Sequence, residues 1–177
     1  MGYPYKVILC PVDFDDNSTA ALGHARQLAS DMGATIYLLH VLPILPAYAD
    51  QVLLDGVDEA AEQEAQRRLE DLAGRKLAGV PVEIHTRITF VSAVPKTILA
   101  FARDLGADLI VMATHGRGVI GHLVFGSVTE AVVRNAVCPV LTLRFGLQTE
   151  PEPKAVDTLP ADDATAASAK KGSRASS

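Results

Sequence analysis

The stretch Met112-Ala113-Thr114-His115-Gly116, followed after nine residues by Gly126-Ser127-Val128-Thr129-Glu130, decides the fold of this chain. An apolar run precedes the first part, and a helical pattern of apolar residues follows Ser127. The stretch therefore predicts the end of a strand, a glycine-bounded loop and the start of a helix. Glycine lets the backbone approach an anion closely, and the N–H groups of a helix start carry the positive end of the helix dipole. We expect a loop that can hold a phosphate.

Strand-like and helical runs alternate on both sides of this stretch. Strands are predicted at residues 6–12, 35–41, 82–88, 109–112 and 139–143, and helices at 18–32, 58–77, 92–105 and 127–136. In the third helix of the series, Ser92 is a candidate N-cap, Pro95 fits the first turn and Gly106 ends the helix. The alternation predicts an α/β fold with a single doubly wound, five-stranded parallel sheet in the order 3-2-1-4-5 and helices on both faces, a Rossmann-like arrangement.

Two segments fall outside this alternation. Residues 42–56 contain Pro43 and Pro46 and show little periodicity, so they predict a mobile loop after the second strand. Residues 147–177 are rich in Ala, Pro, Asp, Ser and Lys and have no apolar pattern, which predicts a disordered tail. We therefore expect one α/β domain over residues 1–146.

Composition excludes several classes of partner. The chain has 177 residues, an apolar fraction of 49% and a net charge of −5, without the basic stripe that a nucleic acid would require. No apolar run approaches the roughly 20 residues that cross a membrane, and no leader pattern is visible. Cys10 and Cys138 lie in or beside apolar runs without metal-binding spacing. We expect a cytoplasmic protein with no membrane and no nucleic-acid partner.

In a sheet of the predicted order, ligands bind where the strand order reverses, between the first and fourth strands. The first strand ends in Pro11-Val12-Asp13, opposite the glycine loop of the fourth. A carboxylate facing backbone amides suits a nucleotide, with Asp13 at a ribose hydroxyl or a metal and the amides at phosphate. Structural roles alone also account for these residues, because Ser127 and Glu130 could form a capping box and Asp13 could be a turn residue that caps the first helix.

Residues 5–145 resemble the UspA superfamily of universal stress proteins, and specifically its nucleotide-binding branch. That branch carries Gly, two residues, Gly, nine residues, then Gly and Ser or Thr; Gly116, Gly126 and Ser127 match it, and Ala113 stands in place of the first glycine. The strand end Val12-Asp13 and residues 106–112 and 137–141 also match.

The resemblance implies an ATP-binding stress-response sensor or switch, with Mg, that hydrolyses ATP slowly at most and is not an enzyme. It assigns nucleotide contacts to Pro11, Val12, Asp13, Val41, Met112, Ala113, Gly116, Arg117, Gly126, Ser127, Val128 and Thr129. It also implies a homodimer through the last strand, whose residues are Val140, Leu141, Thr142 and Leu143. An apolar edge strand of this kind invites pairing with a second copy.

Three other functions compete with ATP binding. A dimeric interaction module of the same fold without nucleotide is the main alternative, and Ala113 favours it. A serine hydrolase using Ser127, His115 and Asp13 is disfavoured because the chain lacks a Gly-x-Ser-x-Gly elbow. The histidines show no ligand spacing, which disfavours a metal enzyme, and His40 in its apolar strand is interpreted as a core histidine.

Overall fold

The computed structural model describes residues 4–48, 59–114 and 126–145. They form a parallel sheet of five strands in the order β3-β2-β1-β4-β5, which confirms the predicted fold class and strand order. The strands are β1 (Val7–Val12), β2 (Thr35–Ile44), β3 (Val82–Phe90), β4 (Leu109–Thr114) and β5 (Val140–Arg144). The helices are α1 (Asp16–Met32), α3 (Glu59–Lys76), α4 (Val94–Leu105) and α5 (Ser127–Asn135), with the short 3-10 turns η1 (Pro46–Tyr48) and η2 (Val91–Ala93). The predicted tail, residues 147–177, lies outside the described residues.

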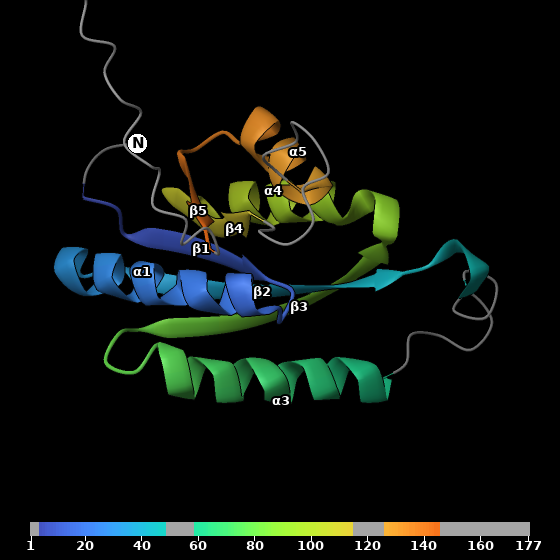
Figure 1. Ribbon diagram of the computed structural model, residues 1–177, viewed down its shortest axis with the longest axis horizontal. Coiled ribbons are helices and arrows are strands. Elements are labelled where there is room, and N and C mark those ends of the chain that lie inside the picture. Colours follow the sequence, from blue (N-terminus) through green and yellow to red (C-terminus); the bar gives the residue numbers. More distant parts are fainter. Residues whose placement is uncertain (1–3, 49–58, 115–125, 146–177) are drawn as a thin grey trace, which may run out of the picture. The chain divides into compact units, whose positions relative to one another are not determined.

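Helices cover both faces of the sheet, as Figure 1 shows for α3 on one side and α4 and α5 on the other. Successive residues of β1 point to opposite faces: Ile8 and Cys10 belong to the core shared with α1 and α3, and Leu9 to the core shared with α4. Ile8 and Leu9 are fully buried, and each such side chain stabilises the fold by roughly 1.5–3 kcal/mol. The central strands are therefore apolar on both sides, as parallel sheets require.

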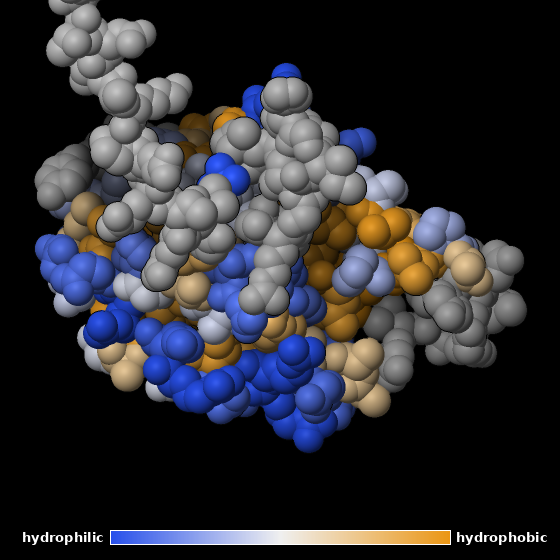
Figure 2. All heavy atoms as spheres, viewed as in Figure 1, coloured by the Kyte–Doolittle hydropathy of each residue, from blue (hydrophilic) through white to orange (hydrophobic). Residues whose placement is uncertain are grey.

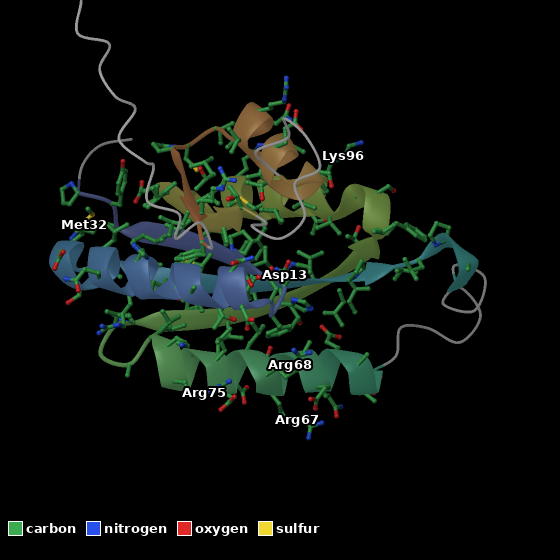
Figure 3. The ribbon with its side chains drawn as sticks, viewed as in Figure 1. Asp13, Met32, Arg67, Arg68, Arg75 and Lys96 are labelled. Carbon is green, nitrogen blue, oxygen red and sulfur yellow. The ribbon has the colours of Figure 1, made fainter. Side chains whose placement is uncertain are left out.

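The outer face of α3 is polar. Leu69 and Leu72 are buried against the sheet, whereas Arg67 and Arg75 point away from it (Figure 3). Figure 2 shows the corresponding hydrophilic surface along this side of the molecule. Ala61, in the first turn of α3, is exposed. No helix among the described residues is long and apolar enough to span a bilayer.

The second strand is longer than predicted. It continues through Pro43 to Ile44, paired with β3 up to Phe90, so the predicted loop at residues 42–56 is wrong for its first three residues. Pro43 was the reason for the wrong prediction, because proline usually breaks strands. Here β1 ends at Val12, opposite His40, and β2 has a neighbour on one side only beyond that point. A proline that faces the open side removes no hydrogen bond from the sheet.

The ends of α4 are partly as predicted. Gly106 ends the helix with φ 69°, a left-handed conformation that glycine adopts without a steric penalty, and its N–H donates to the carbonyl of Ala102. The candidate N-cap Ser92 is wrong, because Ser92 lies in η2 and α4 begins after Ala93 without a side-chain cap. Pro95, in the first turn, fixes the backbone for the helix start in place of a cap.

Candidate functional site

A pocket of about 590 Å³, part of it open to solvent, lies at the carboxyl ends of the central strands, where the strand order reverses. The residues that line it come from β1, α1, β2, α4, β4 and α5: Pro11, Val12, Asp13, Asp15, Ser18, Leu39, Val41, Val94, Ile98, Met112, Ala113, Val128 and Thr129.

Most residues predicted for the site meet in this pocket. Those that line it are Pro11, Val12, Asp13, Val41, Met112, Ala113, Val128 and Thr129. Gly126 and Ser127 do not line it but directly precede Val128 at the start of α5. Gly116 and Arg117 lie outside the described residues.

One wall of the pocket is apolar and was largely missed from the sequence. Val41 on β2 and Met112 on β4 were predicted, but Leu39, Val94 and Ile98 were not. The register pairs Leu39 with Pro11, and Val94 and Ile98 are one helical turn apart on α4. A pairing of the predicted strands in register would therefore have found Leu39. A flat aromatic ring could pack against such a wall without making hydrogen bonds to it.

The carboxylate of Asp13 is held in place at the end of β1. The hydroxyl of Ser18 donates to Asp13 Oδ1 at 2.7 Å, and the backbone N–H of Asp15 donates to the same oxygen at 3.2 Å. Asp15, rather than Asp13, caps α1, because its Oδ1 accepts the N–H of Ser18 at 2.6 Å. The alternative interpretation of Asp13 as the helix cap is therefore wrong, and the sequence signal for the true cap is an Asp three residues before a Ser.

Contacts of the Phe14 ring with His40 and Arg68 hold the loop between β1 and α1. Phe14 has φ 65°, an uncommon conformation for a residue with a side chain. Its ring lies 4.4 Å from the ring of His40 and 4.0 Å from the guanidinium of Arg68, which Figure 3 shows on the side of α3 facing the sheet. A cation over an aromatic ring contributes about 0.5–1 kcal/mol at an exposed site. The contacts with His40 and Arg68 hold Phe14, and with it the position of the adjacent residue Asp13.

His40 supports the same loop from β2. Its Nδ1–H donates to the carbonyl oxygen of Val12 at 2.8 Å, and burial lowers the pKa of the imidazole. The ring is half-buried and hydrogen-bonded to the backbone, as expected of a structural histidine. His40 therefore fixes the end of β1 next to the pocket.

The start of α5 has no side-chain cap. Gly126 is the N-cap residue, and the first backbone bond of the helix runs from the N–H of Glu130 to the carbonyl of Gly126 at 2.9 Å. The predicted capping box is wrong, since Glu130 pairs instead with Arg134, one turn further on, at 2.9 Å. The N–H groups of Ser127, Val128 and Thr129 precede the first backbone bond, as at any helix start, and carry the positive end of the dipole.

Thr129 joins α5 to the sheet. Its hydroxyl is almost fully buried and donates to the carbonyl of Ala113 on β4 at 3.2 Å. The side chain is thus occupied, so any ligand contact of Thr129 has to come from its backbone N–H.

The described part of the chain offers binding groups rather than reactive ones. It contains no group of three or more His, Cys, Asp or Glu side chains placed to hold a metal ion. Burial raises the pKa of the Cys10 thiol to about 12 and also raises the pKa of Cys138, so both are protonated and unreactive at neutral pH. The pocket combines an apolar wall, an anchored carboxylate and an uncapped helix start, a combination that suits a nucleotide.

Comparison with known proteins gives the chain a family. The Universal stress protein family model matches residues 4–144. Universal stress protein MJ0531 of Methanocaldococcus jannaschii is 34% identical over 146 residues, which cover 79% of this chain and 82% of that protein. The solved structure of MJ0577, from the same organism, matches with a TM-score of 0.66 at 27% identity, covering 80% of this chain and 97% of that one.

A fold likeness extends to a nucleotide complex. The universal stress protein from Archaeoglobus fulgidus, solved in complex with dAMP, has a TM-score of 0.54 at 22% identity and covers 78% of this chain and 96% of that one. The family model spans most of the chain and the identity to MJ0531 extends over the same region. The chain belongs to the universal stress protein family.

Proposed function

We propose that the pocket between the ends of β1 and β4 binds ATP and that the protein acts as a stress-response sensor or switch rather than as an enzyme. The observation that carries this proposal is the lining of the pocket, in which an apolar wall, the anchored carboxylate of Asp13 and the uncapped start of α5 surround one space. In a bound nucleotide, the apolar wall would contact the base, Asp13 the ribose and the start of α5 the phosphates.

The apolar wall would take the base. Leu39, Val41 and Met112 are buried, and Val94 and Ile98 close the same side. A planar base gains contact with such side chains, and the backbone of Val41 is the hydrogen-bonding group that the family resemblance assigns to adenine. Asp13, at the end of β1, would accept the ribose hydroxyls.

The start of α5 would take the phosphates. The N–H groups of Ser127, Val128 and Thr129 point along the helix axis toward its N-terminal end, where anions bind. The resemblance adds Gly116 and Arg117, which lie outside the described residues. Mg²⁺ binds through phosphate oxygens and water as readily as through protein carboxylates, so it would enter with the nucleotide. The dAMP bound by the Archaeoglobus fulgidus protein supports an adenine nucleotide in this fold.

Slow turnover at most is expected from the polar groups of the pocket. Asp13 accepts hydrogen bonds from Ser18 and Asp15, and the hydroxyl of Thr129 is bonded to Ala113. Neither group is thereby set to activate a water molecule at a phosphate. The competing function is a nucleotide-free interaction module, which Ala113 favours because this residue lines the pocket where the motif has glycine.

The test is the nucleotide content of freshly purified protein, released by acid and separated by chromatography, together with calorimetric titration of stripped protein with ATP and Mg²⁺. We expect bound adenine nucleotide, and loss of binding in Gly126→Val, because the added side chain stands at the helix start. Gly74→Ala, in the last turn of α3, is the control and should bind normally. Absence of heat at millimolar ATP in the wild type would favour the nucleotide-free module.

A further inference from the structure

We infer that Ser18 is a positioning residue that sets the recognition of ribose hydroxyls by holding the carboxylate of Asp13. This inference rests on the proposed nucleotide function. Ser18 was not predicted for the site, yet it lines the pocket and is almost fully buried, with 7% of its surface exposed.

The hydroxyl of Ser18 lies between three groups of the β1–α1 loop. It is 2.7 Å from Asp13 Oδ1, 3.2 Å from the carbonyl of Asp15 and 3.4 Å from the N–H of Asp13. A hydroxyl has one hydrogen to donate, and the shorter, charge-assisted contact to the carboxylate takes it. The oxygen can then accept the N–H of Asp13, so that Ser18 and Asp13 bind each other in both directions.

Asp13 is exposed, and these hydrogen bonds help to orient its carboxylate. Oδ1 has two donors, the hydroxyl of Ser18 and the N–H of Asp15. Two donors on one oxygen fix the rotation of the carboxylate plane. Recognition of a sugar diol requires such a fixed plane, since both hydroxyls have to find acceptor directions at once.

The rest of the loop does not depend on the hydroxyl. The cap of α1 uses the backbone N–H of Ser18, which donates to Asp15 Oδ1 and is retained in any substitution other than proline. The contacts of the Phe14 ring with His40 and Arg68 do not involve the hydroxyl of Ser18 either. Ser18→Ala therefore removes the shorter of the two hydrogen bonds to Asp13 Oδ1, so that the carboxylate plane is less strictly fixed, while the fold of the loop stays in place.

The experiment compares ATP with 2′,3′-dideoxy-ATP by calorimetry for the wild type, Ser18→Ala and Ser18→Thr. A hydrogen bond to a charged group contributes enough for roughly a tenfold change in affinity. We expect the wild type to prefer ATP about tenfold, Ser18→Ala to lose most of that preference by binding ATP more weakly, and Ser18→Thr, which keeps a hydroxyl, to restore it. Affinity for the dideoxy compound should be the same in all three. In Asp13→Ala, the further change Ser18→Ala should have no effect on the preference.

The outcomes separate the two proposals. If the wild type binds ATP and Ser18→Ala weakens both compounds equally, Ser18 acts on the fold and the inference is wrong. An unchanged preference in Ser18→Ala, or no preference in the wild type, also overturns it and leaves the proposed function intact. If the wild type binds neither compound, the proposed function fails, and the inference fails with it.

Discussion

The imidazole of His40 on β2 donates a hydrogen bond to the carbonyl of Val12, the last residue of β1, at 2.8 Å. This bond crosses from one strand to its neighbour at the point where the neighbour leaves the sheet, one residue before Asp13. The bond needs a hydrogen on Nδ1, which both the Nδ1–H tautomer and the protonated ring carry, and it acts to raise the pKa of His40; burial is the larger effect and lowers the pKa.

The burial of His40 predicts how the free energy of unfolding depends on pH. In the folded state the pKa of His40 lies below its ordinary value of 6.5, so near and below that value the unfolded chain binds more protons than the folded one. The contribution of His40 to the free energy of unfolding is therefore full above pH 6.5 and falls as the pH drops from there through the folded pKa. Urea unfolding at pH 7.5 and 5.5 measures this loss.

The variant His40→Gln isolates the effect, because it cannot titrate. The difference in unfolding free energy between wild type and His40→Gln should shrink as the pH is lowered. Parallel pH curves for the wild type and His40→Gln would contradict the prediction.

Both thiols should be inert in the native protein. Cys10 is buried with a pKa of about 12, and Cys138 is buried with a raised pKa, so neither forms a thiolate at pH 8. We expect no reaction with Ellman's reagent under native conditions and two thiols per chain after denaturation in guanidinium. Rapid reaction of one thiol in the native state would mean that its site is open.

Two glycine-to-alanine substitutions should have opposite signs. Gly106 has φ 69° at the end of α4, where alanine is destabilising by about 1–2 kcal/mol. Gly74 lies in the last turn of α3 with no atom within 4 Å of an added Cβ, so alanine should stabilise the helix, by at most about 0.5–1 kcal/mol. Urea unfolding of both variants checks the pair, and equal signs would contradict it.

We propose a homodimer through β5, an edge strand of the sheet. The N–H of Ile110 donates to the carbonyl of Pro139, so by the alternation of a parallel ladder the backbones of Val140 and Thr142 face away from β4. These groups are available to a second copy. Lysines at Val140 and Leu141 would be a poor test, because both side chains pack against the protein's own cores.

Thr142→Pro tests the dimer without removing core contacts. Proline lacks the outward N–H and is tolerated on edge strands. In analytical ultracentrifugation we expect the wild type at twice the chain mass of 18.7 kDa and Thr142→Pro at that of the single chain. Thr142→Val, which keeps the N–H, should remain dimeric. A wild-type monomer, or a dimer that persists in Thr142→Pro, would rule out this interface.

The fold was predictable because the strand order follows from general rules once the alternation is recognised. Leu109 and Val140 begin short apolar runs typical of strands, and right-handed crossovers then leave few topologies. The predicted reversal of strand order places the ends of the first and fourth strands together, and Asp13 and Met112 line one pocket there. These predictions rest on long-range geometry that the chain cannot avoid.

The errors have a common physical origin in local signals that tertiary contacts override. Pro43 indicates a loop only if both sides of the strand are paired, and one side is open. Glu130 indicates a capping box only if no cation competes for it, and Arg134 does. Val94 and Ile98 carry no polar signal, so only the packing of α4 on the sheet identifies them as pocket residues.

The bond between Thr129 and Ala113 has a consequence for the thermodynamics of any ligand that reaches both sides of the pocket. Because the hydroxyl of Thr129 ties the first turn of α5 to the end of β4, the two walls are held at one separation before a ligand arrives. Little conformational entropy then remains to be lost on association. Such a preorganised gap favours ligands of one length over shorter or longer analogues, and discrimination would come from rigidity rather than from added contacts.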